Sequence, residues 1–513
     1  MLAKVLSYGL SGLDGYLVEI EADISAGLSK FDIVGLADTA IKESKDRVKS
    51  AIKNSGLNYP IDAITINLAP ADKKKEGPLY DLPIAISLLC ANGTIDHRKA
   101  KDIIFFGELS LDGSIKKVNG VLPMLISARA NGFKTFILPS ANYLEASFID
   151  GIDVYVADNL KQIVSHFSNN ENTSLKKVLP SNYSDIQKEA KDKTIDMKNV
   201  KGQAVAKRAL EIAAAGGHNV LMIGPPGSGK TLLAKCFSGI LPNMSFDEAL
   251  EVTKIHSIAG ILDDSKGIIV NRPFRTPHHT ATTIALAGGG KDAKPGEISL
   301  AHNGVLFLDE LPEYNRQFIE VLRQPLEDGQ ITVARSKQTV TYPASFIMIA
   351  SMNPCPCGNY GSKTQVCRCT PQQIHKYLSK LSGPIMDRID LHVEVDAISY
   401  DDISSTKEEE SSTSIKNRIN FARDIQLKRF KNSKIYANAK MDVVQTKKYC
   451  KLDQQAEQML KIAFEKLKMS ARAHDRILKV ARTIADLDNS ETIKVNHIAE
   501  AINYRSLDRK YWI

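Results

Sequence analysis

A glycine-rich loop ending in a lysine is the segment of this chain best suited to chemistry. Residues 224–231 read Gly-Pro-Pro-Gly-Ser-Gly-Lys-Thr and follow the apolar run Val220–Ile223. Glycines let successive backbone N–H groups turn inward around phosphate oxygens, and the next helix offers its positive N-terminus to the anion. The pattern predicts that Lys230 reaches the β- and γ-phosphates of a nucleotide and that Thr231 binds Mg²⁺. The binding residues are predicted to be Gly224, Pro225, Pro226, Gly227, Ser228, Gly229, Lys230 and Thr231.

Two further apolar runs end in polar residues that suit hydrolysis. Val305–Leu308 is followed by Asp309 and Glu310, and a later strand-like run reaches Asn353. One carboxylate can bind Mg²⁺ and a second can polarise the attacking water, so we assign the metal to Asp309 and the base to Glu310. The amide of Asn353 can hold that water. These residues predict an ATP hydrolase that uses Mg²⁺, with Lys230, Glu310 and Asn353 as catalytic residues.

Four of the seven cysteines are clustered. Cys355 and Cys357 come from one short loop and Cys367 and Cys369 from another, within fifteen residues. Four thiolates suit a closed tetrahedral zinc site, although the spacing has one residue between cysteines instead of the commoner two. The alternative is four reduced surface cysteines or a redox-active set. We predict structural zinc, because free clustered thiols invite oxidation.

The elements around these motifs predict an α/β fold in several domains. Residues 1–167 mix alternating runs with helical segments, as an α+β domain does, and polar residues 168–185 are interpreted as a linker. Residues 186–400 alternate strands and helices around the phosphate loop. After a solvated loop, residues 415–513 keep helical spacing and form a C-terminal helical domain.

Composition and charge indicate the compartment and the possible partners of the protein. The formal net charge is +8, which permits nucleic-acid binding without demonstrating it. Acidic residues interrupt the first twenty positions, so we expect no secretory signal, and the most apolar stretch, 82–91, is too short to span a bilayer. We therefore expect a cytoplasmic protein with no membrane partner.

The order of these motifs resembles that of AAA+ ATPases. Within that superfamily, Pro277-His-His-Thr280, Pro295–Leu300 and Met352-Asn-Pro-Cys-Pro-Cys-Gly358 resemble the magnesium-chelatase-like branch, and specifically the ComM/YifB subfamily. Val34-Gly-Leu-Ala37 and Ala481–Asp486 extend the resemblance to both ends of the chain. It implies a central AAA+ P-loop ATPase domain followed by a helical lid.

The resemblance also implies arginines that complete the nucleotide site. Arg388 takes the place of an arginine finger, which enters the neighbouring subunit's site and neutralises transition-state charge. Arg472 takes the place of a second sensor on the helical lid, with Arg476 as its rival one helical turn later. A finger acting between subunits implies a ring, expected to be a hexamer.

A charged hairpin is the expected contact for a threaded polymer. Residues 330–342 alternate apolar and polar side chains around a short turn, with Arg335 and Lys337 at its tip. In the branch that this chain resembles, the hairpin projects into the pore of the ring. Arg335 and Lys337 are therefore expected to bind the backbone of branched or single-stranded DNA without sequence preference. A solvated turn is the alternative.

The first domain resembles the proteolytic domain of Lon-type proteases, which has the fold of ribosomal protein S5 domain 2. That fold normally uses a serine activated by a lysine. Here the serine position is Leu79 and the lysine position falls near Leu122, so no nucleophile is expected there. The domain is expected to contact DNA or to assemble the ring.

The leading hypothesis is a ring-forming, ATP-dependent DNA motor. The resemblance implies a branch-migration helicase that acts on recombination intermediates during natural transformation. Two alternatives use the same ATPase core: a motor that drives Mg²⁺ into a porphyrin, and an ATP-dependent protease or protein unfoldase. The missing dyad and the absence of an aromatic grip in the hairpin count against the last.

Overall fold

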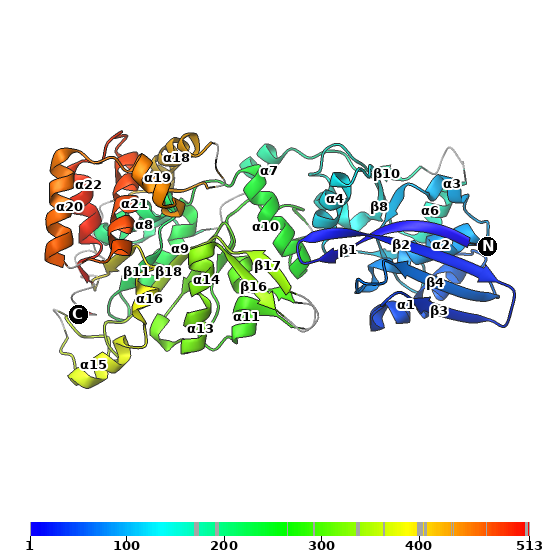
Figure 1. The fold of residues 1–513 in the computed structure, drawn as a ribbon, viewed down its shortest axis with the longest axis horizontal. Coiled ribbons are helices and arrows are strands. Elements are labelled where there is room, and N and C mark those ends of the chain that lie inside the picture. Colours follow the sequence, from blue (N-terminus) through cyan, green and yellow to red (C-terminus); the bar gives the residue numbers. More distant parts are fainter. Residues whose placement is uncertain are drawn as a thin grey trace. The chain divides into compact units, whose positions relative to one another are not determined.

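The computed structural model divides the chain into two compact units (Figure 1). It describes residues 2–168, 174–189, 194–263, 265–290, 293–334, 339–362, 365–397, 404, 408–431, 433, 435–467, 469–507 and 511. The first unit comprises residues 1–189 and 246–270, and the second comprises residues 190–245 and 271–513. Both units mix helices and strands, in agreement with the α/β class expected from the sequence.

The first unit is built on a sheet with the strand order β10-β9-β8-β5-β1-β2-β4-β3. Its centre is a long antiparallel pair, β1 and β2, and β5, β8 and β9 extend it in parallel. The strands are β1 (Leu2–Ser11), β2 (Asp14–Ser25), β3 (Lys30–Val34), β4 (Ala63–Ala69), β5 (Ile103–Phe105), β8 (Thr135–Pro139), β9 (Asp153–Ala157) and β10 (Lys176–Lys177), with a separate small hairpin of β6 (Glu108–Leu109) and β7 (Ile115–Lys116).

Apolar residues point to both faces of this sheet and form two cores. Consecutive strand residues face opposite sides, so Phe105 joins one core while Ile104 joins the other. The first core takes residues from α1 (Thr39–Asn54), α2 (Asp81–Ala91) and α6 (Leu160–Phe167), and the second takes residues from α4 (Val121–Ala130). Shorter helices are α3 (His97–Ala100), α5 (Tyr143–Ala146) and α7 (Tyr183–Glu189).

The two positions expected to have lost a proteolytic dyad are occupied by packed leucines. Leu122 lies in α4 and is 1% exposed. Leu79 is half-buried and contacts both cores. Both side chains therefore serve packing.

A segment from the middle of the chain completes the first unit. Helix α10 (Phe246–Ala259) contacts α4, and Leu250 packs on the second core. The backbone N–H of Gly120 donates to Ser257 Oγ at 3.0 Å, and Ser257 Oγ donates to the buried carboxylate of Glu145. The unit therefore includes residues 246–270, which the sequence placed within residues 186–400.

The segment expected as a linker also has regular structure in its described part. Residues Lys176–Lys177 form β10 and pair antiparallel with β9. Residues Tyr183–Glu189 form α7, and the first compact unit extends to Glu189. The boundary between units therefore lies after residue 189, later in the chain than the expected end of the first domain at residue 167.

The second unit is built on a parallel five-stranded sheet with the order β12-β15-β18-β11-β19. Its strands are β12 (Phe274–Arg275), β15 (Val305–Leu308), β18 (Ile347–Met352), β11 (Val220–Ile223) and β19 (Leu391–Glu394). Most of their residues are buried, as is usual for parallel strands covered on both faces. Two small hairpins accompany the sheet: β13 (Gly288–Gly289) with β14 (Lys294–Pro295), and β16 (Gln330–Ala334) with β17 (Thr339–Pro343).

Helices from both ends of the second unit share one hydrophobic core. Helices α18 and α21 contact α8, and the C-terminal helices gather beside it in Figure 1. The helices are α8 (Ala204–Gly216), α9 (Lys230–Ile240), α11 (Thr283–Ala287), α12 (Glu297–Leu300), α13 (Arg316–Val321), α14 (Arg323–Asp328), α15 (Pro371–Leu378), α16 (Gly383–Met386), α18 (Ser412–Arg429), α19 (Val443–Tyr449), α20 (Gln454–Leu467), α21 (Ala471–Leu487) and α22 (Val495–Asn503).

A buried ion pair fixes α21 to the start of β19. Arg476 Nη1 donates to Asp390 Oδ1 at 2.6 Å, and the backbone N–H of Asn219 donates to Asp390 Oδ2 at 3.0 Å. Burial alone would raise the pKa of Asp390, but the guanidinium of Arg476, the imidazole of His218 and the N–H of Asn219 hold it well below its usual value. Burial removes water from the Asp390 carboxylate, and its ion pair and hydrogen bonds compensate for that loss.

Within the part of the chain that the structure describes, no helix combines the length and the apolar character needed to cross a bilayer.

The Arg476→Ala variant should destabilise the second unit by about 3 kcal/mol, because it leaves the Asp390 carboxylate buried without its cation. The matched control is Arg472→Ala, which removes an exposed arginine from the same helix and should change stability by at most about 0.5 kcal/mol. Thermal unfolding at neutral pH measures both.

The loss should depend on pH. The folded-state pKa of Asp390 is lowered, so its stabilisation is present above the unfolded pKa of about 3.9 and is lost as pH falls below it. The difference in unfolding temperature between wild type and Arg476→Ala should therefore become smaller at acidic pH. Equal unfolding temperatures at neutral pH would contradict the assignment.

Candidate nucleotide site and cysteine cluster

The predicted phosphate, metal and water ligands come together at one edge of the parallel sheet. Strand β18 lies between β11 and β15, and Ile223 pairs with Met352 while Leu308 pairs with Ala350. The strands are parallel, so their carboxyl ends meet at the same edge, which is where ligands bind in open α/β sheets. The phosphate loop, Asp309 and Asn353 follow directly after these strand ends.

Glycines are required at fixed points of the phosphate loop. A side chain at Gly224 would place its Cβ 2.1 Å from the carbonyl oxygen of Val395, which the backbone cannot accommodate. Gly227 and Gly229 have φ values of 78° and 88°, in the left-handed region that favours glycine. Helix α9 begins immediately afterwards at Lys230, so its free N–H groups face the loop.

Lys230 lies inside this loop, as the motif predicts. Its Nζ donates to the carbonyl oxygens of Gly224 and Pro225 at 2.8 Å each, and it lies 3.3 Å from Asn353 Oδ1. Only 8% of the residue is exposed. Burial lowers the pKa of Lys230, while the nearby carboxylates of Asp309 and Glu310 oppose that shift. The amine is held where the strand ends meet.

The residues expected to bind Mg²⁺ are in direct contact. Thr231 Oγ1 donates to Asp309 Oδ2 at 2.9 Å. A hydroxyl and a carboxylate are hard oxygen ligands of the kind that Mg²⁺ takes, alongside phosphate oxygens and water. The donor set therefore fits a magnesium nucleotide.

Ser351 is a site residue that the motif analysis missed. Its hydroxyl donates to Asp309 Oδ1 and accepts the backbone N–H of Glu310 at 3.2 Å. Ser351 is fully buried, and it is the one hydroxyl residue in the strand Ile347–Met352. A polar residue in an otherwise apolar strand, two positions before Asn353, was the available signal. From the neighbouring strand, Ser351 thus holds the carboxylate of Asp309 and the backbone of Glu310.

Glu310 has an unusual backbone. Its φ is 53°, a left-handed conformation that is strained for a residue with a side chain, and it is exposed. Strain of this kind costs on the order of 1 kcal/mol and is concentrated at functional sites. The carboxylate assigned as the base is thus at the solvent-accessible side of the strand ends.

The three arginines considered for the nucleotide site have different partners. Arg388 is bound within its own chain, because it pairs with Glu327 and donates to the carbonyl oxygen of Pro384 at 2.7 Å. Arg476 is engaged with Asp390. Arg472 is exposed and has no ion pair among the described residues, so it is the arginine of α21 that is available to a ligand.

The predicted hairpin is present, although its tip is outside the described residues. Strands β16 and β17 pair antiparallel from Gln330 with Pro343 to Ala334 with Thr339. Ile331, Val333, Val340 and Tyr342 are buried, and the alternate residues of both strands are more exposed. Arg335 and Lys337, which we expect to contact DNA, are among the residues not described, so their placement stays a prediction.

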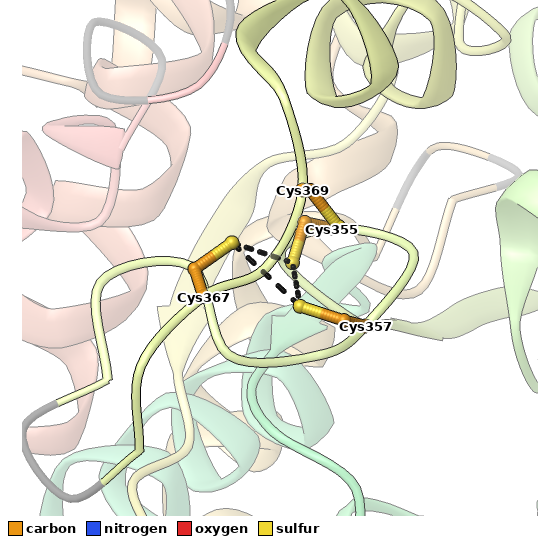
Figure 2. A group of neighbouring side chains, drawn as sticks. All are labelled: Cys355, Cys357, Cys367 and Cys369. Atoms are coloured by element: carbon orange, nitrogen blue, oxygen red, sulfur yellow. Dashed lines mark hydrogen bonds between the residues drawn. The ribbon is translucent and has the colours of Figure 1, made fainter.

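The four clustered cysteines converge (Figure 2). Their sulfur atoms all lie within 4.8 Å of one another, with Cys355, Cys357 and Cys367 separated by 3.4 to 3.7 Å. Four sulfurs bound tetrahedrally at about 2.3 Å from zinc would be about 3.8 Å apart. A disulfide requires about 2.05 Å, so the spacing fits a shared metal better than a covalent bond.

Backbone N–H groups also face this cluster. Those of Arg368 and Asn359 lower the pKa of Cys357 to about 6. The N–H of Tyr360 donates to Cys355 Sγ at 3.3 Å. Such donors stabilise thiolate, the form that binds metal.

Comparison with known proteins gives matches along most of the chain. The profile described as magnesium chelatase, subunit ChlI, matches residues 196–403. A second profile, subunit ChlI of Mg-chelatase, matches residues 20–142, and the C-terminal profile of the same subunit matches residues 409–505. The parallel sheet and these matches fit a fold of the AAA+ type.

Full-length relatives are also found. YifB of Escherichia coli (strain K12) is 44% identical over 501 residues, which are 97% of this chain and 96% of the relative. Competence protein ComM of Haemophilus influenzae is 41% identical over 515 residues, covering 99% and 98% of the two chains. The magnesium-chelatase 67 kDa subunit of Chlorobaculum parvum is 26% identical, over only 30% of this chain and 23% of its own. On its motifs, its parallel sheet and its full-length relatives, the chain belongs to the ComM/YifB-type magnesium-chelatase-like proteins.

Proposed function

We propose that this protein is an ATP hydrolase that assembles as a ring and moves along DNA. The observation that supports ATP hydrolysis most strongly is the contact of Thr231 with Asp309, beside Lys230 and Asn353, at the carboxyl edge of the sheet. The 41% identity to a competence protein supports a role in handling transforming DNA. The proposed task is branch migration of recombination intermediates by a hexamer.

The side chains divide the work of hydrolysis. Bound ATP with Mg²⁺ supplies the phosphoryl group and part of the charge neutralisation. Lys230 stabilises negative charge on the phosphates, while Thr231 and Asp309 hold the metal. Glu310 polarises the attacking water, and Asn353 orients it. Ser351 keeps Asp309 in place through its hydrogen bond.

The two arginines complete the proposal. To act on the nucleotide of a neighbouring subunit, Arg388 must exchange its partner Glu327 for the phosphates. This exchange makes the finger dependent on assembly. Arg472, exposed at the start of α21, is proposed to contact the γ-phosphate in its own subunit.

DNA is proposed to bind at the tip of the β16–β17 hairpin. Arg335 and Lys337 would grip phosphates without reading bases. Metal insertion into a porphyrin is the competing use of this ATPase core, and the magnesium-chelatase profiles are the observation that favours it. Remodelling of proteins is the other competing use.

We also propose that Cys355, Cys357, Cys367 and Cys369 hold one structural Zn²⁺. The convergence of four sulfurs at distances suited to a tetrahedral ion supports this assignment. No position is left open for a substrate when all four ligands are protein thiolates, so the ion would be structural.

The Ser351→Ala variant is expected to reduce ATP turnover by about 10- to 100-fold, because residues that orient metal ligands typically contribute that much. Glu310→Gln should abolish turnover. The control is Ser238→Ala, which removes a hydroxyl that donates to the carbonyl oxygen of Lys235 within α9 and which should keep wild-type activity. Wild-type turnover by Ser351→Ala would contradict the role given to Ser351.

DNA binding is tested with a double variant, Arg335→Ala with Lys337→Ala. It should lose DNA-stimulated ATPase activity but keep basal turnover, and its affinity for single-stranded DNA should depend less on salt, by a slope of about 1 to 2. Lys447→Ala with Lys461→Ala removes two exposed lysines of α19 and α20 and is the control. Stimulation by unfolded protein or a porphyrin-binding partner, with none by branched or single-stranded DNA, would replace the DNA proposal.

Purified protein is expected to contain one zinc per chain, measured by elemental analysis. Cys367→Ser should lose it, whereas Cys90→Ala, which changes a buried cysteine of the first unit, should retain it. Substoichiometric zinc that is the same in wild type and in Cys357→Ser would overturn the assignment.

A further inference from the structure

We infer that the cysteine cluster is a positioning device for the nucleotide site, so that loss of its metal slows ATP hydrolysis. The inference rests on the proposed ATPase activity and on the proposed metal. Its starting point is the chain order: Asn353 is followed by Pro354 and then by Cys355, which is fully buried. Only one residue separates the sensor amide from a metal ligand.

The other end of the cysteine segment is also connected to Asn353. Cys369 is followed by Thr370, which caps α15 with Gln373 in a capping box. Near the far end of that helix, the buried side chain of Tyr377 lies close to Asn353: burial raises the pKa of its hydroxyl, and the backbone N–H of Asn353 partly offsets that rise. The segment that begins at Asn353 therefore runs through the cysteines into α15 and comes back close to Asn353. A metal that joins Cys355 to Cys369 would close this loop and so fix the position of Asn353, whose side chain faces Lys230.

The cluster makes a second connection, to the phosphate loop itself. The turn Cys355–Gly358 is closed by the Gly358 N–H, which donates to the carbonyl oxygen of Cys355 at 2.9 Å. A Cβ at Gly358 would lie 2.4 Å from Pro226 Cδ. The backbone of the cysteine turn thus packs directly on the loop that would hold the phosphates.

Outside the cysteines, the described part of this segment has local hydrogen bonds, such as that from the Gly358 N–H to the Cys355 carbonyl oxygen, and a ring contact between Tyr360 and Tyr511 at 6.3 Å. Metal binding to a site of this kind orders the segment that supplies the ligands. The metal is therefore expected to set the position of both Asn353 and Pro226.

The first test compares zinc-loaded protein, chelator-treated protein and Cys367→Ser, with ATPase activity measured without DNA. Metal loss should lower kcat at least about 10-fold, change nucleotide affinity by less than about 3-fold, and be reversed when zinc is returned to the chelated wild type. Val366→Ala, at an exposed position beside Cys367, is the control and should behave as wild type. Equal kcat with and without metal in folded protein would overturn the inference.

A second variant keeps all four thiols. Gly358→Ala should retain one zinc and lose about as much stability as Gly361→Ala, since both place a side chain at a positive φ, but it alone should lose turnover because the added methyl displaces Pro226. Gly361→Ala is the matched control, because Gly361 also has a positive φ, 75° against 81° at Gly358. Normal turnover by zinc-loaded Gly358→Ala would overturn the contact proposed here.

These outcomes are separable from failure of the proposed function. A protein that hydrolyses ATP with metal-dependent kcat but ignores DNA leaves this inference standing and removes the DNA proposal. A zinc-loaded wild type that does not hydrolyse ATP overturns both.

Discussion

The parallel pairing of β18 between β11 and β15 is the constraint on which the nucleotide site depends. Backbone hydrogen bonds fix the register, so that the strand ends at Ile223, Leu308 and Met352 meet at one edge although they are distant in sequence. The register places Ser351 against Asp309 and Asn353 against Lys230. Most other features of the second unit, including the buried strands and the helices that cover them, serve to hold that edge in place.

The two compact units are not consecutive along the chain, because a segment from the middle of the sequence belongs to the first unit. Helix α9 belongs to the nucleotide site, yet the next helix, α10, belongs to the core of the first unit. Leu250 of α10 packs on the second core of the first unit, and Ser257 of α10 hydrogen-bonds with Gly120 and Glu145. The first unit is therefore not a separable appendage, because residues 246–270 are part of its fold.

The two arginines near the start of α21 differ in role, and a buried carboxylate partner decides which of them is structural. Arg476 and Asp390 form a pair that the fold requires, whereas Arg472 on the same helix is exposed. Both arginines lie in one short segment, one helical turn apart, so the sequence alone could not show which is structural and which is available to a ligand. The difference arises because Asp390, 86 residues earlier in the chain, reaches only one of them.

The sequence by itself determined the motifs whose chemistry is local: the glycines and lysine of the phosphate loop, the acids after an apolar strand, the hairpin and the four cysteines. These could be predicted because spacing along a short segment fixes their geometry. Tertiary structure alone decided the role of Ser351, the return of α15 to Asn353, the contact of Gly358 with Pro226 and the membership of α10 in the first unit. Each of these depends on segments distant in sequence, and their contacts follow from strand register and core packing, which no local pattern specifies.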